Sequence, residues 1–182
     1  MATAFRIRSQ TPQYRWRIVV IGGLTMAGAH AMLLHRLDAG DFTPDLFSIF
    51  ALYVGLFASR HGRYTPSLVL GLIRDFFSIG LLGSYGVLYS LLHKVAERAR
   101  GKLDPERPLN VFLMALTGTF LVNFGYHAML VIAGDGIGWT RALARCASIA
   151  IASAPFAVAL FPLFHLGLDT LRVDRQGGYW NF

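Results

Sequence analysis

The chain is poor in charged residues and almost devoid of cysteine. Only 15% of its 182 residues are charged, whereas a soluble domain carries about 25%. The single cysteine excludes an intramolecular disulfide. The sequence contains no G-x-S-x-G elbow, no P-loop and no HExxH, and its histidines lack ligand spacing. We therefore predict no enzymatic activity, no cofactor and no metal site.

Long apolar stretches dominate what is present, since 54% of the residues are hydrophobic. A helix needs about 20 residues to cross the hydrocarbon of a bilayer. On this basis we predict an all-α integral membrane protein, with residues 1–182 forming a single membrane domain. Pro44 is expected in the first turn of the second helix, where its missing N–H does little harm. The six predicted transmembrane helices cover residues 16–36, 42–59, 65–79, 83–96, 109–133 and 140–171.

The positions of the basic residues predict how these helices are oriented. Basic loops stay in the cytoplasm, so the clusters place both termini and two loops on the cytoplasmic side of a membrane. The net charge of +7 then reflects this topology and attraction to anionic lipid headgroups, and no nucleic-acid partner is expected. The clusters are Arg6, Arg8, Arg15 and Arg17; Arg60 and Arg63; Lys94, Arg98, Arg100, Lys102 and Arg107; and Arg172 and Arg175.

Residues 64–93 are too many for one ordinary span and few for two. A single span would put the basic clusters on either side of this stretch on opposite sides of the membrane. Two short helices that turn between Gly80 and Gly83 keep both clusters inside. Glycine suits such a turn because it accepts a positive φ without a steric penalty. We expect the turn to lie below the outer surface, shielded by longer helices.

Arg74 and Asp75 are the charged residues within this stretch, and a charge in a membrane usually faces a partner inside the protein. Our hypothesis is that Asp75 pairs with Arg141 or Arg145, near the outer end of the sixth helix, and locks the third helix to the sixth. A proton or ion relay is the functional alternative. The structural pair is favoured because no second membrane carboxylate stands nearby in the sequence.

Small residues at four-residue spacing mark a face of the first helix where another helix backbone can approach closely. They are Gly23, Ala27 and Ala31. The neighbour is either a helix of the same bundle or a helix of another protein. Asn123 and His127 share a face of the fifth helix. That face either lines a polar cavity or hydrogen-bonds to a neighbouring helix, and we favour the second interpretation.

Two motifs carry a family resemblance. The first is Thr43-Pro44-Asp45-Leu46. The second is Gly71-Leu72-Ile73-Arg74-Asp75-Phe76-Phe77-Ser78, which is followed by Leu82-Gly83 and an apolar run to residue 92. The segment 43–92 resembles the rod shape-determining protein MreD family, and the remainder is similar in its helix pattern. The resemblance singles out Pro44, Gly71, Asp75 and Gly83 and implies that they shape a groove for a partner helix.

The resemblance implies a non-enzymatic scaffold subunit of the bacterial elongation machinery, the Rod complex. Such a subunit would bind MreC and, indirectly, the elongation transpeptidase (a penicillin-binding protein), RodA and MreB. The family's fold is similar to that of the substrate-binding components of energy-coupling-factor transporters.

A vitamin-type transport component is therefore the alternative function. It would take its ligand near the outer face and dock a coupling subunit on the first helix. The candidate ligand residues are Asn123, Tyr126, His127 and Trp139. An intramembrane enzyme is a weaker interpretation, because no pair of nucleophile and base can be identified.

Overall fold

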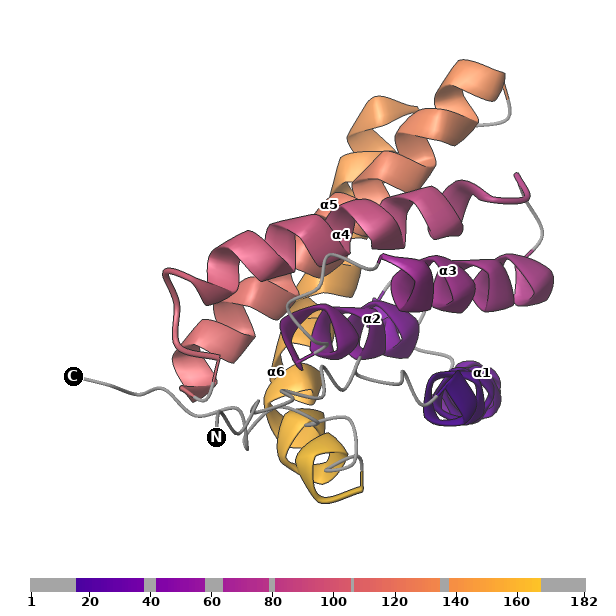
Figure 1. Ribbon diagram of the computed structural model, residues 1–182. Coiled ribbons are helices and arrows are strands. Elements are labelled where there is room, and N and C mark those ends of the chain that lie inside the picture. The colour runs from indigo at the N-terminus through magenta and orange to yellow at the C-terminus, as the bar shows by residue number, and fades with distance from the viewer. Residues whose placement is uncertain are drawn as a thin grey trace, which may run out of the picture.

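The computed structural model describes residues 16–37, 42–57, 64–78, 81–105, 107–134 and 138–167. Within these residues it contains six α-helices and no strand, so the all-helical prediction is confirmed (Figure 1). Two helices, α5 and α6, are long and apolar enough to cross a membrane. The helices are α1 (Trp16–Leu37), α2 (Leu46–Phe57), α3 (Thr65–Phe77), α4 (Ser84–Arg100), α5 (Pro108–Ala133) and α6 (Trp139–Gly167).

Helix α2 forms the centre of the molecule. Every residue from Leu46 to Leu56 is buried, and α2 contacts each of the other five helices. A helix that is apolar all round is stable only when other elements cover every face. Its aromatic side chains join α6, because the ring of Tyr53 packs against those of Phe161 and Phe164.

The start of α2 differs from the prediction. Residues 43–45 are not helical and α2 begins at Leu46. Asp45 is the N-cap, because its Oδ1 accepts a hydrogen bond from the backbone N–H of Ser48 at 3.1 Å. Pro44 therefore precedes the helix, and the prediction that it lies in the first turn was wrong. A carboxylate at the N-cap fixes the helix start more strongly than a proline that any first turn tolerates.

Helices α3 and α4 form a tight antiparallel hairpin. A Cβ added to Gly71 would lie 2.4 Å from backbone atoms of Gly86, so the two backbones touch at this crossing. Gly83 begins α4 with φ +90°, a conformation that favours glycine. Helix α4 continues to Arg100, one turn beyond the predicted end at residue 96. The added turn contains Glu97, Arg98 and Arg100, which are good helix formers in water.

The long pair α5 and α6 packs beside this hairpin (Figure 1). In Figure 1 the neighbouring ends of α5 and α6 lie on the same side of the molecule as the α3–α4 turn, and the chain passes from α4 to α5 on the opposite side. Helix α6 continues through Pro155 and Pro162. In Figure 1 helix α1 is seen end-on and runs across α3 and α4, so the six helices do not all lie along one direction.

Several predicted features lie outside the described residues. They are the basic residues at positions 6–15, 60–63 and 172–175, the first glycine of the α3–α4 turn at residue 80, and the end of the sixth helix beyond residue 167. The direction of insertion that these clusters predict therefore stays a prediction.

The crossing of α3 and α4 generates a first prediction. We expect Gly71→Ala to lower the free energy of unfolding by about 1–3 kcal/mol, because the new methyl group overlaps backbone that cannot move aside. Gly86→Ala is the matched control, since a Cβ there finds only ordinary contacts at 3.7 Å. Reversible unfolding in mixed detergent micelles measures both. Equal losses for the two variants would contradict the close crossing.

Candidate functional site

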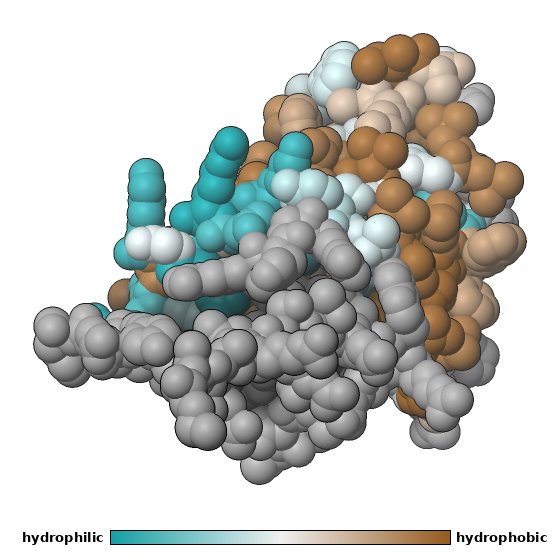
Figure 2. Space-filling view, in the orientation of Figure 1, coloured by the Kyte–Doolittle hydropathy of each residue, from teal (hydrophilic) through white to brown (hydrophobic). Residues whose placement is uncertain are grey.

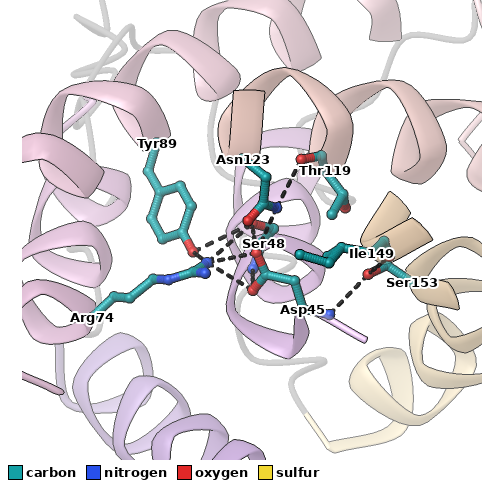
Figure 3. A network of polar contacts seen from close by, with 8 residues as sticks. All are labelled: Asp45, Ser48, Arg74, Tyr89, Thr119, Asn123, Ile149 and Ser153. Atoms are coloured by element: carbon teal, nitrogen blue, oxygen red, sulfur yellow. Dashed lines mark hydrogen bonds and ion pairs between the residues drawn. The ribbon is translucent and has the colours of Figure 1, made fainter. Parts of the chain in front are cut away.

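A buried ion pair joins α3 to the start of α2. The Nη1 atom of Arg74 donates to both carboxylate oxygens of Asp45, each at 2.7 Å (Figure 3). The two side chains are 12% and 3% exposed. A buried arginine that lost its carboxylate would leave an uncompensated charge, which costs several kcal/mol. The pair therefore strongly constrains how α2 and α3 pack.

Asp45 also forms hydrogen bonds to α5 and α6. Its Oδ2 accepts hydrogen bonds from the Ser48 hydroxyl at 2.6 Å and from the Asn123 amide of α5 at 3.1 Å. Its backbone N–H donates to the Ser153 hydroxyl of α6 at 2.8 Å, and Ser153 in turn donates to the Ile149 carbonyl (Figure 3). One residue thus has polar contacts with α2, α3, α5 and α6.

Aromatic side chains of α4 complete the surroundings of Arg74. The Tyr89 hydroxyl accepts a hydrogen bond from the guanidinium group. The guanidinium carbon lies 3.9 Å from the centroid of the Tyr85 ring. The ring of Tyr126, from α5, stacks on the Tyr85 ring with 4.4 Å between the two centroids. A guanidinium over an aromatic face gains a cation–π attraction that grows when water is excluded. We call Asp45, Ser48, Arg74, Tyr89, Asn123 and Ser153 the polar cluster.

Asp75 points away from the polar cluster and caps α4. Its carboxylate accepts the backbone N–H groups of Gly83, Tyr85 and Gly86 at 3.0–3.4 Å, and the Ser84 hydroxyl at 3.3 Å. The first N–H groups of a helix have no partner within the helix, and its N-terminus attracts negative charge. Asp75, which is 4% exposed, therefore satisfies from α3 the donors that open α4.

The predicted pairing of Asp75 with Arg141 or Arg145 is wrong. The Asp75 carboxylate is occupied by the start of α4, while both arginines are exposed on the first turns of α6. The carboxylate partner of the buried Arg74 is Asp45 instead. Adjacent residues of a helix point about 100° apart, so α3 directs Arg74 toward α2 and Asp75 toward α4.

The other predicted site residues are mostly inside the fold. Gly71 and Pro44 are buried and Gly83 is half-buried. In the small-residue row of α1, a Cβ on Gly23 would lie 2.9 Å from Leu70 of α3, and Ala27 is 7% exposed. Ala31 alone of that row is exposed. The row therefore packs within the bundle at two of its three positions.

Asn123 hydrogen-bonds to a neighbouring segment, which is the interpretation favoured from the sequence. Of the other residues assigned to a ligand pocket, Tyr126 stacks on Tyr85. Trp139 is half exposed and lies near the ring of Phe124. His127 is buried, and its Nδ1 has no hydrogen-bond partner among the described residues. The two aromatic residues assigned to a ligand pocket thus pack on different rings, Tyr126 on Tyr85 and Trp139 near Phe124.

The polar cluster connects helices through one ion pair and several hydrogen bonds. The Asp45 carboxylate receives donors from Arg74, Ser48 and Asn123, which leaves little capacity for a substrate or an ion. Among the described residues no group of three His, Cys, Asp or Glu side chains is placed to hold a metal. The arrangement can hold five helices in one geometry.

Sequence reasoning missed Asp45, Tyr89 and Ser153. The sequence placed Asp45 within the predicted helix 42–59 and in the motif Thr43-Pro44-Asp45-Leu46, and assigned it no partner. One local signal was available: Asp is a preferred N-cap residue, and Asp45 directly precedes a long apolar run. No local signal connects Asp45 to Arg74, because 29 residues separate them.

The ion pair predicts strong coupling between its two partners. We expect Asp45→Asn and Arg74→Met each to lower the free energy of unfolding by about 3–5 kcal/mol, because each leaves the other group uncompensated. Asparagine caps a helix as well as aspartate, so Asp45→Asn isolates the charge. The double variant should lose clearly less than the sum of the single variants, as a double-mutant cycle measures. Additive losses would mean that the pair does not hold the fold.

The exposed pair of Arg107 and Asp104 provides the matched control for the ion pair. Its side chains are 76% and 52% exposed and lie 3.5 Å apart. We expect Arg107→Gln to change the stability by less than about 1 kcal/mol, because water screens an exposed pair.

The cap predicts a local effect at the start of α4. Asp75→Ala should speed hydrogen exchange at the amides of Gly83, Tyr85 and Gly86 by about tenfold, the size of a lost helix cap. Asp75→Asn should have a smaller effect, because one acceptor oxygen remains. Arg141→Gln should leave these amides unchanged. If it speeded exchange as Asp75→Ala does, the rejected pairing with α6 would be restored.

Comparison with known proteins assigns the chain to a family. The rod shape-determining protein MreD family matches residues 11–168, which include all of the polar cluster. No curated protein matches the chain, and no solved structure matches it. Because the match extends over most of the 182 residues, this chain belongs to the MreD family of rod shape-determining proteins.

Proposed function

We propose that this chain is a non-enzymatic membrane scaffold of the bacterial Rod complex, which binds MreC and supports peptidoglycan synthesis during elongation. Membership of the MreD family assigns it to rod shape determination. The observation that carries the scaffold role is the polar cluster. The Asp45 carboxylate and the Arg74 guanidinium group bind each other, and these two residues also hydrogen-bond to the side chains of Ser48, Tyr89, Asn123 and Ser153. A scaffold needs rigidity, and a satisfied buried network provides it.

A multi-pass position in the inner membrane, with both termini in the cytoplasm, is part of this proposal. Large apolar side chains are exposed on five of the six helices, among them Ile21, Phe76, Leu91, Ile132 and Ile151. Figure 2 shows apolar residues over the side that carries the α3–α4 turn and the α5–α6 pair, and hydrophilic residues over the opposite side. In water such a surface would aggregate, whereas in a bilayer it faces acyl chains.

The outer face of α1 is the surface that we assign to the MreC helix. Ile21, Leu24 and Met32 are 50–65% exposed there, and Thr25 and Gly28 lie between them on the same face. A Cβ on Gly28 would meet nothing within 4 Å. The Thr25 hydroxyl donates to carbonyls of its own helix, so it needs no water. A small centre flanked by larger apolar residues suits a second membrane helix.

Co-purification tests this function directly. A tagged chain, extracted from its native membrane in mild detergent, should bring MreC with it, as identified by mass spectrometry. Gly28→Leu should abolish most of this recovery because the new side chain fills the docking face. It should leave the unfolding transition unchanged, since the space is open. Ala144→Leu, a matched change on the exposed face of α6, should retain MreC.

The same experiment separates the scaffold from the transport component. Recovery of an ATPase pair and a small molecule, without MreC, would reject the scaffold and favour the transporter. The structure gives the transporter one supporting observation, the unpartnered Nδ1 of the buried His127. Against it, the amide of Asn123 is already bound to Asp45 and to the Thr119 carbonyl, so it is not free for a ligand.

A further inference from the structure

One face of α4 changes from apolar to basic along its length. Val87, Leu91 and Val95 are about half exposed and lie one turn apart. Lys94 and Arg98 continue the same face and are exposed. The opposite face of α4 packs into the core through residues such as Tyr89 and Leu92. We call this stripe of five exposed residues the outer face of α4.

The basic residues fix the depth that the hairpin can reach. From Lys94 back to Ser84 the helix rises about 15 Å, at 1.5 Å per residue, and any tilt reduces that depth. The hydrocarbon of a bilayer is about 30 Å thick. With Lys94 at the boundary between hydrocarbon and headgroups, the α3–α4 turn lies near the middle of the bilayer.

The side chains at the turn are those expected at that depth. Phe76, Phe77 and Leu82 are 65–81% exposed. Exposing such a group of large apolar side chains to water is unfavourable. Backbone donors in hydrocarbon must be satisfied within the protein. The Asp75 carboxylate provides this for Gly83, Tyr85 and Gly86, which explains how a helix can begin inside the membrane.

At the base of the hairpin the chemistry matches an anionic headgroup. Arg98 and Lys94 lie one turn apart, and the Lys94 ammonium lies 5.1 Å from the ring centroid of Tyr64. Tyrosine is enriched at the membrane surface, where its ring is apolar and its hydroxyl polar. Glu97, which is also exposed, points about 100° away from Arg98 and lies three residues from Lys94, at one edge of this pair. A phospholipid suits this stripe, because its phosphate can bind the two cations while its acyl chains cover the apolar residues. An acidic protein surface would bind the cations but would leave Val87 and Leu91 uncovered.

We propose that the α3–α4 hairpin penetrates only half of the bilayer and that the outer face of α4 binds an anionic phospholipid. The phosphate lies between Lys94 and Arg98, and an acyl chain lies along Val87, Leu91 and Val95. This inference rests on the membrane placement given under the proposed function and is independent of MreC.

Native mass spectrometry of the detergent-purified chain with added phosphatidylglycerol or phosphatidylcholine tests the lipid site. Phosphatidylglycerol should bind more tightly than phosphatidylcholine. Arg98→Gln should weaken phosphatidylglycerol binding by about fivefold, the effect of one basic residue near a lipid surface. Arg141→Gln, which removes an equally exposed arginine from α6, should leave it unchanged. Equal effects of the two variants, or no preference between lipids, would overturn the site.

A depth measurement tests the hairpin separately. A nitroxide on Leu82→Cys, in a Cys146→Ala background and in nanodiscs, should be relaxed by oxygen and shielded from a water-soluble nickel reagent. A label accessible to nickel would overturn the half-depth hairpin. Loss of MreC recovery by Arg98→Gln with unchanged lipid binding would show that the stripe contacts protein instead. Failure of the chain to insert into membranes would reject the proposed placement itself.

Discussion

The ion pair between Arg74 and Asp45 is the constraint on which the arrangement of helices depends. An arginine among apolar side chains is tolerated only when a carboxylate and further acceptors surround it. Here these acceptors come from the start of α2 and from α4, and the same carboxylate is held by α5. The charge is compensated only when these helices approach together, so the pair selects one packing among many apolar alternatives.

Arg74 and Asp75 give α3 two different connections through consecutive residues. Arg74 ties α3 to the central helix α2, and Asp75 ties it to the first turn of α4. The second connection requires the backbones of α3 and α4 to be close, which Gly71 and Gly86 permit. The glycine crossing, the cap and the ion pair therefore support one another, and the hairpin and the bundle form one unit.

The polar cluster lies inside the molecule, and large apolar side chains lie on its surface. The side chains of the polar cluster bind one another, whereas the outer faces of α1 and α4 present apolar side chains with a few small or basic residues among them. A rigid interior keeps those faces in fixed relative positions. Such a framework suits the scaffold role proposed above for this member of a rod shape-determining family.

The sequence by itself determined the helical class, the number of helices and the position of the α3–α4 turn. These features follow from hydropathy and turn chemistry within a few residues, as at Gly83 with its φ of +90°. The extension of α4 beyond residue 96 was missed, because hydropathy does not report on a helix that continues through charged residues.

Only the tertiary structure decided which charges meet. Asp45 and Arg74 are 29 residues apart, and their contact follows from how α2 and α3 pack. The same packing turned Asp75 from an expected partner of α6 into the cap of α4, and placed Gly23 against Leu70. Local pattern identifies a buried charge that needs a partner. The choice of that partner depends on non-local packing, in which many helices must fit at once.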